Sequence, residues 1–110
     1  MTNKDYVAKI IDLANVVDYA DASVVSKTIV SKKAGTCTVF AFDKGEGLSE
    51  HTASYDAIIE VLDGDAEITI KGDNFNLKTG EMIIMPANKP HSVQAPSKFK
   101  MLLIMIKSEE

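Results

Sequence analysis

The sequence is short of the residues that several classes of protein depend on. Cys37 is the only cysteine among 110 residues, so one chain can form neither an internal disulfide nor a zinc cluster built from several thiolates. The longest unbroken apolar run, from Met101 to Ile106, is far shorter than the roughly 20 residues that a membrane-spanning helix needs. We therefore expect no internal disulfide and no membrane partner, with Cys37 packed as a small apolar side chain.

Basic clusters are also missing. The formal net charge is −4, and no run of five or more basic residues occurs, so the sequence lacks the positive surface that binding to a phosphate backbone requires. Nucleic acid is therefore not an expected partner. The segment from Met1 to Asp12 carries charges where a secretory signal peptide has an apolar stretch, which predicts a cytoplasmic location.

The remaining composition is that of an ordinary globular domain, with 45% apolar and 25% charged residues. A chain of this length forms one domain with one core, so residues 1–110 are interpreted as a single domain. A core this small leaves much surface exposed, which favours association with a second copy.

Apolar and polar residues alternate, or apolar residues form short runs between Gly, Pro, Asp and Asn, a pattern that predicts many short strands. Turn residues are clearest in Asp63-Gly64-Asp65 and in Lys71-Gly72-Asp73-Asn74. The predicted strands are residues 26–30, 36–42, 50–53, 57–62, 66–70, 74–77, 82–85, 91–94 and 100–106. The fold class is therefore all-β, with an N-terminal arm at residues 1–25 and a barrel at residues 26–106. Within the arm, residues 5–16 fit either one helical turn or an extended segment.

The last predicted strand is apolar on both faces. One face can fill the interior, whereas the other needs a cover, either residues 6–16 of the arm or a second subunit. We expect a homodimer to contribute to this cover. The methionine and phenylalanine side chains are expected to fill the core: Met82, Met85, Met101, Met105, Phe40, Phe42, Phe75 and Phe99.

Two stretches show a regular spacing. The first reads Gly45, five residues, His51, one residue, Ala53, three residues, Ala57, six residues, Gly64. The second reads Gly80, five residues, Pro86, Ala87, Asn88, two residues, His91, three residues, Ala95. This spacing resembles the two motifs of the cupin superfamily, and the strand pattern extends the likeness to the small single-domain cupins. Asn88 stands where that family has glycine, and asparagine is among the few residues that adopt a positive φ at low cost.

The resemblance implies a double-stranded β-helix, a jelly roll with a cavity between two sheets. In metal-binding cupins, two histidines and a glutamate of the first motif and one histidine of the second hold a divalent transition metal. His51 and His91 match the first and last of these ligands, whereas Ala53 and Ala57 stand at the other two positions. The resemblance therefore implies a degenerate metal site.

Carboxylates close in sequence could replace the missing ligands. Glu50 and Asp56 adjoin His51 and Ala57, and Glu60 lies an odd number of residues from Ala57, so strand alternation places all three facing away from the cavity. Two imidazoles alone hold a divalent transition metal only weakly. We expect no tightly bound cofactor.

Three hypotheses follow for the function. The first is that a small organic molecule binds in a cavity lined by His51, Ala53, Ala57 and His91. The second is a metal-dependent dioxygenase, isomerase or decarboxylase that uses His51 and His91 with a further ligand. The third is a structural or interaction module that acts through its dimer surface. The plain alternative for the two histidines is that they only form hydrogen bonds with water or backbone. The fold by itself does not indicate which reaction, if any, the protein catalyses.

Overall fold

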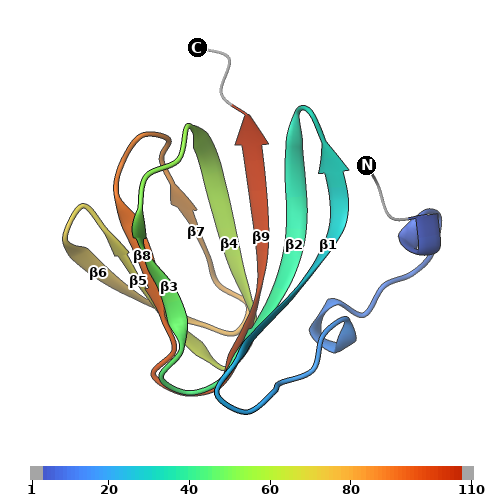
Figure 1. The fold of residues 1–110 in the computed structure, drawn as a ribbon, viewed down its shortest axis with the longest axis horizontal. Coiled ribbons are helices and arrows are strands. Elements are labelled where there is room, and N and C mark those ends of the chain that lie inside the picture. The colour runs from blue at the N-terminus through green and yellow to red at the C-terminus, as the bar shows by residue number, and fades with distance from the viewer. Residues whose placement is uncertain (1–3, 108–110) are drawn as a thin grey trace.

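A computed structural model describes residues 4–107 of the chain. Two short 3-10 turns, η1 and η2, precede nine strands, and the chain order is shown in Figure 1. The elements are η1 Lys4–Tyr6, η2 Leu13–Asn15, β1 Val24–Lys32, β2 Gly35–Phe42, β3 Gly47–His51, β4 Tyr55–Asp63, β5 Asp65–Ile70, β6 Asp73–Lys78, β7 Met82–Met85, β8 His91–Gln94 and β9 Phe99–Lys107. No helix among these residues is long and apolar enough to cross a membrane.

The strands form two antiparallel sheets that face each other as a jelly roll (Figure 1). One sheet has five strands in the order β1-β2-β9-β4-β7, and the other has four in the order β3-β8-β5-β6. The expected all-β double-stranded β-helix is confirmed, and each predicted strand overlaps one that is observed. The barrel begins at Val24, two residues before the start expected from the sequence.

The predicted strand at residues 50–53 is misplaced, because β3 ends at His51 and Ala53 lies in the link to β4. The start of β3 is hidden in the sequence by Gly47, since glycine is uncommon inside strands. Here glycine is required, because a Cβ atom on Gly47 would lie 2.2 Å from the carbonyl oxygen of Val93 on β8.

The connections follow the turn chemistry expected from the sequence. Gly64 has φ +76° between β4 and β5, and Lys71 and Gly72 both have positive φ between β5 and β6. Asn88 has φ +65°, so it adopts the conformation that glycine supplies in the second cupin motif.

The main core lies between the two sheets. The rings of Phe42 and Phe99 stack with their centroids 4.5 Å apart, and both side chains are fully buried. Met85 and Met101 also belong to this core, as expected.

Two of the expected core residues are exposed instead. Met82 is 53% exposed because it projects outward from β7, the edge strand of the five-stranded sheet. Phe75 is 41% exposed because it lies on β6, the edge strand of the other sheet.

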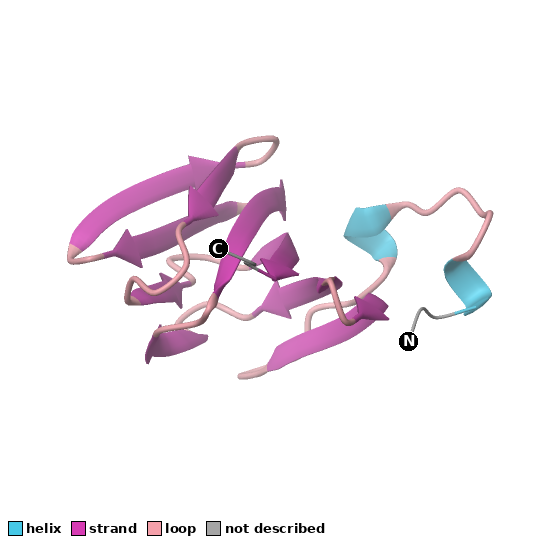
Figure 2. Cartoon of the chain, turned by 90° about the horizontal axis from the view of Figure 1, so that it is seen from above, coloured by secondary structure: helices cyan, strands magenta, loops and turns pink. Residues whose placement is uncertain are grey.

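The N-terminal arm runs over the outer face of the five-stranded sheet as irregular chain with two 3-10 turns, and Figure 2 shows it beside the barrel. A second core forms under it, where Val17 and Leu102 are 6% and 9% exposed. Lys100 also reaches the arm, since its Nζ donates to the carbonyl oxygen of Ala14 at 2.6 Å. The arm covers only part of the outer face of β9, because Ile106 remains 50% exposed.

Candidate functional site

The fold brings together two histidines that are 40 residues apart in sequence. His51 ends β3, His91 begins β8, and the two are paired in register because these strands run antiparallel. An irregularity in the pairing between Leu48 and His51 turns the His51 ring toward its partner. The ring centroids are 4.4 Å apart at an interplanar angle of 72°, and the two Nε2 atoms are 3.1 Å apart.

Backbone carbonyls hold both rings from the opposite side. Nδ1 of His51 lies 2.8 Å from the carbonyl oxygen of Ser49, and Nδ1 of His91 lies 3.2 Å from that of Lys89. A carbonyl oxygen only accepts hydrogen bonds, so each of these contacts requires a proton on Nδ1, and in that tautomer Nε2 of each ring is left as an acceptor. Two lone pairs at this separation repel each other. The close contact between the two Nε2 atoms therefore requires a group between them: a shared proton, an N–H or O–H donor, or a cation.

The two imidazoles differ in exposure. His91 is 4% exposed, whereas His51 is exposed to solvent at the mouth of the site. Burial lowers the pKa of His91 below its ordinary value, the neighbouring His51 lowers it further, and the hydrogen bond to the Lys89 carbonyl opposes the change. The buried ring is therefore neutral near neutral pH.

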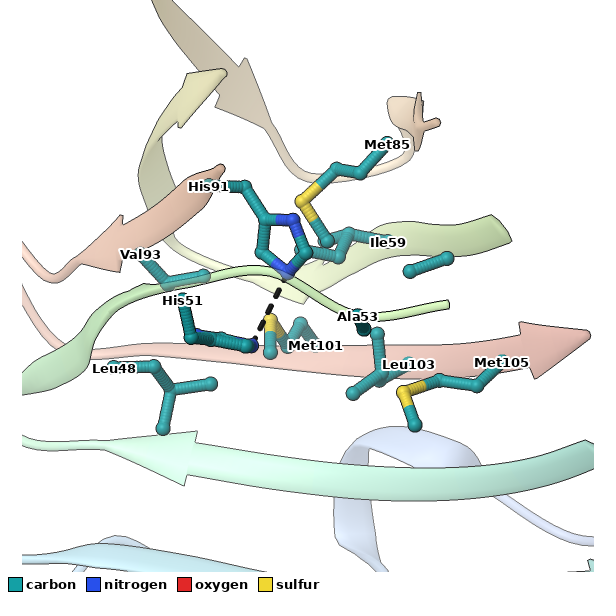
Figure 3. Close-up of a pocket in the computed structure, with 11 residues that line it drawn as sticks. Leu48, His51, Ala53, Ile59, Met85, His91, Val93, Met101, Leu103 and Met105 are labelled. Carbon is teal, nitrogen blue, oxygen red and sulfur yellow. Dashed lines mark hydrogen bonds between the residues drawn. The ribbon is translucent and has the colours of Figure 1, made fainter. Parts of the chain in front are cut away.

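The imidazole pair closes one side of a cavity between the sheets (Figure 3). All four residues expected from the sequence line this cavity: His51, Ala53, Ala57 and His91. The rest of its wall is apolar: Leu48, Ile59, Met85, Val93, Met101, Leu103 and Met105. None of the three nearby carboxylates, Glu50, Asp56 and Glu60, is part of the wall, and Asp56 instead accepts a hydrogen bond from the backbone N–H of Ala87.

The cavity is small, about 30 Å³, although alanines replace two larger side chains of the motif. The cavity remains small because the neighbours of Ala57 are large: Ala57 is paired with Met85 on β7 and with Met105 on β9. Long thioether side chains on both sides thus occupy space that the alanine leaves.

The sequence predicts that Met85, Met101 and Met105 fill the core, but it does not predict that they line the cavity. Strand alternation carried a signal for two of them, since Met101, Leu103 and Met105 lie at every second position of β9 and share its inner face. No such signal exists for Met85, whose place depends on the pairing of β7 with β4.

Comparison with models of known families identifies the family of this chain. The model of the family described as Cupin domain matches residues 38–107, which include both histidines and both motif alanines. The chain belongs to the cupin family.

Several solved structures resemble this cupin along most of its length. A conserved protein of unknown function from Streptococcus pyogenes is 37% identical with a TM-score of 0.88, covering 94% of this chain and 90% of that one. A cupin 2 conserved barrel domain protein from Leptotrichia buccalis is 43% identical with a TM-score of 0.86 over 88% of this chain, which spans 47% of that protein. A cupin superfamily protein from Desulfitobacterium hafniense is 26% identical with a TM-score of 0.87, covering 92% and 93% of the two chains. No curated protein matches, so these likenesses show the family and leave the activity open.

The residues of this cupin do not fit the complete divalent-metal site of the family. Among residues 4–107, no group of three or more histidine, cysteine, aspartate or glutamate side chains could hold an ion. Catalytic transition-metal sites use three or four protein ligands, and here Ala53 and Ala57 supply none. What remains is a pair of converging imidazole nitrogens at the edge of an apolar cavity.

Proposed function

We propose that this cupin binds a small organic molecule in the barrel cavity without a tightly held divalent metal. The apolar body of the molecule lies among the methionine and leucine side chains, and one hydrogen-bonding group meets the two Nε2 atoms. The observation that carries this proposal is the geometry of His51 and His91, whose Nε2 atoms converge where the apolar wall is interrupted. Apolar walls with a few convergent polar atoms are the usual composition of small-molecule sites.

The size of the cavity supports binding that is accompanied by movement of the wall. A volume of about 30 Å³ exceeds the roughly 10–15 Å³ that one water needs, but it is far below the space that an organic molecule fills. Methionine is unbranched and has three rotatable side-chain bonds, so Met85 and Met105 can swing away from Ala57 at modest cost. The site thus opens as it binds, from the side where His51 is exposed to solvent.

The imidazoles also favour one kind of polar group on the bound molecule. Since each Nδ1 is held by a carbonyl, the two Nε2 atoms are the acceptors that face the cavity. A hydroxyl or amino group of the bound molecule supplies the donor that this arrangement needs.

The test uses protein freed of metal by a chelator and pairs of compounds that share one hydrocarbon body, with and without a hydroxyl group. Thermal shift should select hydroxyl-bearing compounds, and the shift should be lost in His51→Ala and His91→Ala and blocked by Ala57→Leu. Glu67→Gln, on the outer face of β5 in the four-stranded sheet, is the matched control and should bind like the parent. Equal binding of both members of each pair, or unchanged binding after loss of both histidines, would contradict the proposal.

A metal-dependent enzyme is the second candidate, because each imidazole already has the Nδ1–carbonyl contact that commonly orients a metal-bound histidine. It requires a ligand beyond the two histidines. Elemental analysis of tag-free protein separates the candidates, since a stoichiometric divalent metal that disappears in the double histidine variant supports the enzyme and refutes a metal-poor site.

The outer face of the five-stranded sheet supports the proposal of a homodimer. One apolar row crosses all five strands in register, through Ile84, Ile58, Ile104, Cys37 and Val30. Ile84 is 57% exposed, so the arm leaves this end of the row open. Met82 on β7 and Ile106 on β9 are also exposed on this face, at 53% and 50%, and exposed apolar residues gathered on one face are characteristic of an interface.

Charge on the same face favours a second copy as the occupant. Glu60 lies outward on β4, toward one edge of the sheet, and Lys32 lies outward on β1 at the opposite edge. A two-fold axis parallel to β9 brings the acidic side of one copy over the basic side of the other. Sedimentation should therefore give a dimer that Ile84→Lys dissociates and Lys71→Ser leaves intact, whereas a monomer at micromolar concentration would refute it.

A further inference from the structure

We propose that the imidazole pair and the methionine thioethers of the cavity together form a binding site for a soft monovalent metal ion, Cu(I). This inference goes beyond the proposed function, because it assigns to the same cavity a second type of ligand that the alanine positions do not exclude. The donors are Nε2 of His51, Nε2 of His91 and the sulfurs of Met101 and Met85.

The two nitrogens lie close to the separation that a shared ion requires. With metal–nitrogen bonds of about 2.1 Å, two imidazole nitrogens on a tetrahedral ion lie roughly 3.4 Å apart, so a small outward shift of the rings suffices. The observed distance between Nε2 of His51 and Nε2 of His91 is 3.1 Å. Both rings are also held at Nδ1 by carbonyls, so little rearrangement is needed to direct both lone pairs at one ion.

Thioether sulfurs complete the donor set. Met101 and Met85 line the same cavity as the two imidazoles and are 0% and 2% exposed. In Figure 3 the sulfur-bearing end of the Met101 side chain points toward the imidazole pair, and that of Met85 reaches in from the side of His91. Met105 lies farther along β9.

The chemistry of this set favours Cu(I) over the divalent metals of the family. Thioethers are soft ligands that select Cu(I), whereas carboxylates suit harder divalent ions, and no carboxylate lines this cavity. All four donors are neutral, and a single positive charge costs less than a double one in an apolar cavity that offers no compensating anion. A cavity of about 30 Å³ also accommodates an ion without the repacking that an organic molecule needs.

Cys37 must be removed before the site can be tested, because a thiolate competes for Cu(I). It lies on the outer face of β2 in the second core, so Cys37→Ser leaves the cavity unchanged. The experiment uses full-length Cys37→Ser protein under anaerobic, reducing conditions, with no organic compound added and with a chromogenic chelator competing for Cu(I).

We expect one Cu(I) per chain, together with changes in the NMR signals of both imidazoles and of the Met101 and Met85 methyl groups. Met101→Leu and Met85→Leu, which nearly preserve volume, should weaken Cu(I) binding on the order of 10–100-fold. Met82→Leu, at an exposed position on β7, is the matched control and should leave the affinity unchanged.

Three results would overturn the inference: no saturable Cu(I) binding, Zn(II) binding as tight as Cu(I) binding, or methionine variants that bind like the control. Circular dichroism of each variant establishes that it is folded. Because the small-molecule test uses chelator-treated protein and this one contains no organic compound, each proposal can fail without the other.

Discussion

The two faces of the five-stranded sheet are covered to different extents. On the inner face, β9 places Met101 against the opposing sheet, where it is fully buried. On the outer face, the same strand passes from Leu102, which is 9% exposed under the arm, to Ile106, which is 50% exposed. On the inner face, burial is complete at Met101 and partial at Leu103 and Met105, whereas on the outer face the arm covers only one end.

This difference separates the residues that stabilise the fold from those that are open to association. A strand apolar on both faces requires two covers, and the inner cover supplies the core together with the cavity and its imidazole pair. The outer face has a cover of irregular chain, joined to the sheet by isolated polar contacts such as that of Lys100 with Ala14. Substitutions on the inner face should therefore affect folding, and those at the open end of the outer face should affect association.

The largest effect is expected at the centre of the inner face. Phe42→Ala removes a ring that stacks on Phe99 in the fully buried core. The free energy of unfolding, measured by urea denaturation, should fall by about 3–5 kcal/mol. A loss below 1 kcal/mol would show that the inner face is not the main source of stability.

A smaller loss is expected under the arm. Leu102→Ala empties a position that is 9% exposed and packs in the second core with Val39 and Val17. The same measurement should give a loss of about 2–3 kcal/mol, near the lower end for buried leucine, because irregular chain can relax into the space. A loss equal to that of Phe42→Ala would remove the distinction between the two covers.

A still smaller and pH-dependent effect is expected where the arm joins β4. The hydroxyl of Tyr19 donates to a carboxylate oxygen of Asp63 at 2.5 Å, so Tyr19→Phe should cost about 0.5–1.5 kcal/mol at neutral pH. Burial, and then the bond to Asp63, raise the pKa of Tyr19 above its ordinary value of 10.0. Because the folded state holds the proton more tightly, this stabilisation is complete below pH 10.0 and is lost as the pH rises above it. The difference between parent and variant should shrink in that range, and a difference independent of pH would exclude Tyr19 as its source.

The smallest effect on folding is expected at the open end of the outer face. Ile84→Ser at a 57% exposed position should change the unfolding free energy of dissociated chains by about 0.5 kcal/mol or less. It should nevertheless weaken dimerisation measurably in sedimentation. A large loss of stability in dilute protein, with association unchanged, would reverse the assignment of this surface.

The sequence was sufficient for features that depend on local pattern. Alternation gave the strands, the glycine and asparagine positions gave the turns, and motif spacing placed Ala53 and Ala57 on the cavity wall. It was insufficient where distant strands decide the outcome. The approach of Val93 to Gly47 hides the start of β3, and the pairing of β7 with β4 places Met85 beside Ala57. Residues 5–16 fit both a helical turn and an extended segment in sequence, because the two 3-10 turns of the arm are too short to show a period.

The central claim is that the Nε2 atoms of His51 and His91 converge to receive a bound molecule at the cavity mouth. The chain has two histidines, so a long-range ¹H–¹⁵N spectrum recorded with the compound selected by thermal shift resolves each imidazole. We predict that both rings keep a proton on Nδ1 while both Nε2 signals move as the compound saturates the protein. Saturation with both Nε2 signals unchanged would contradict it.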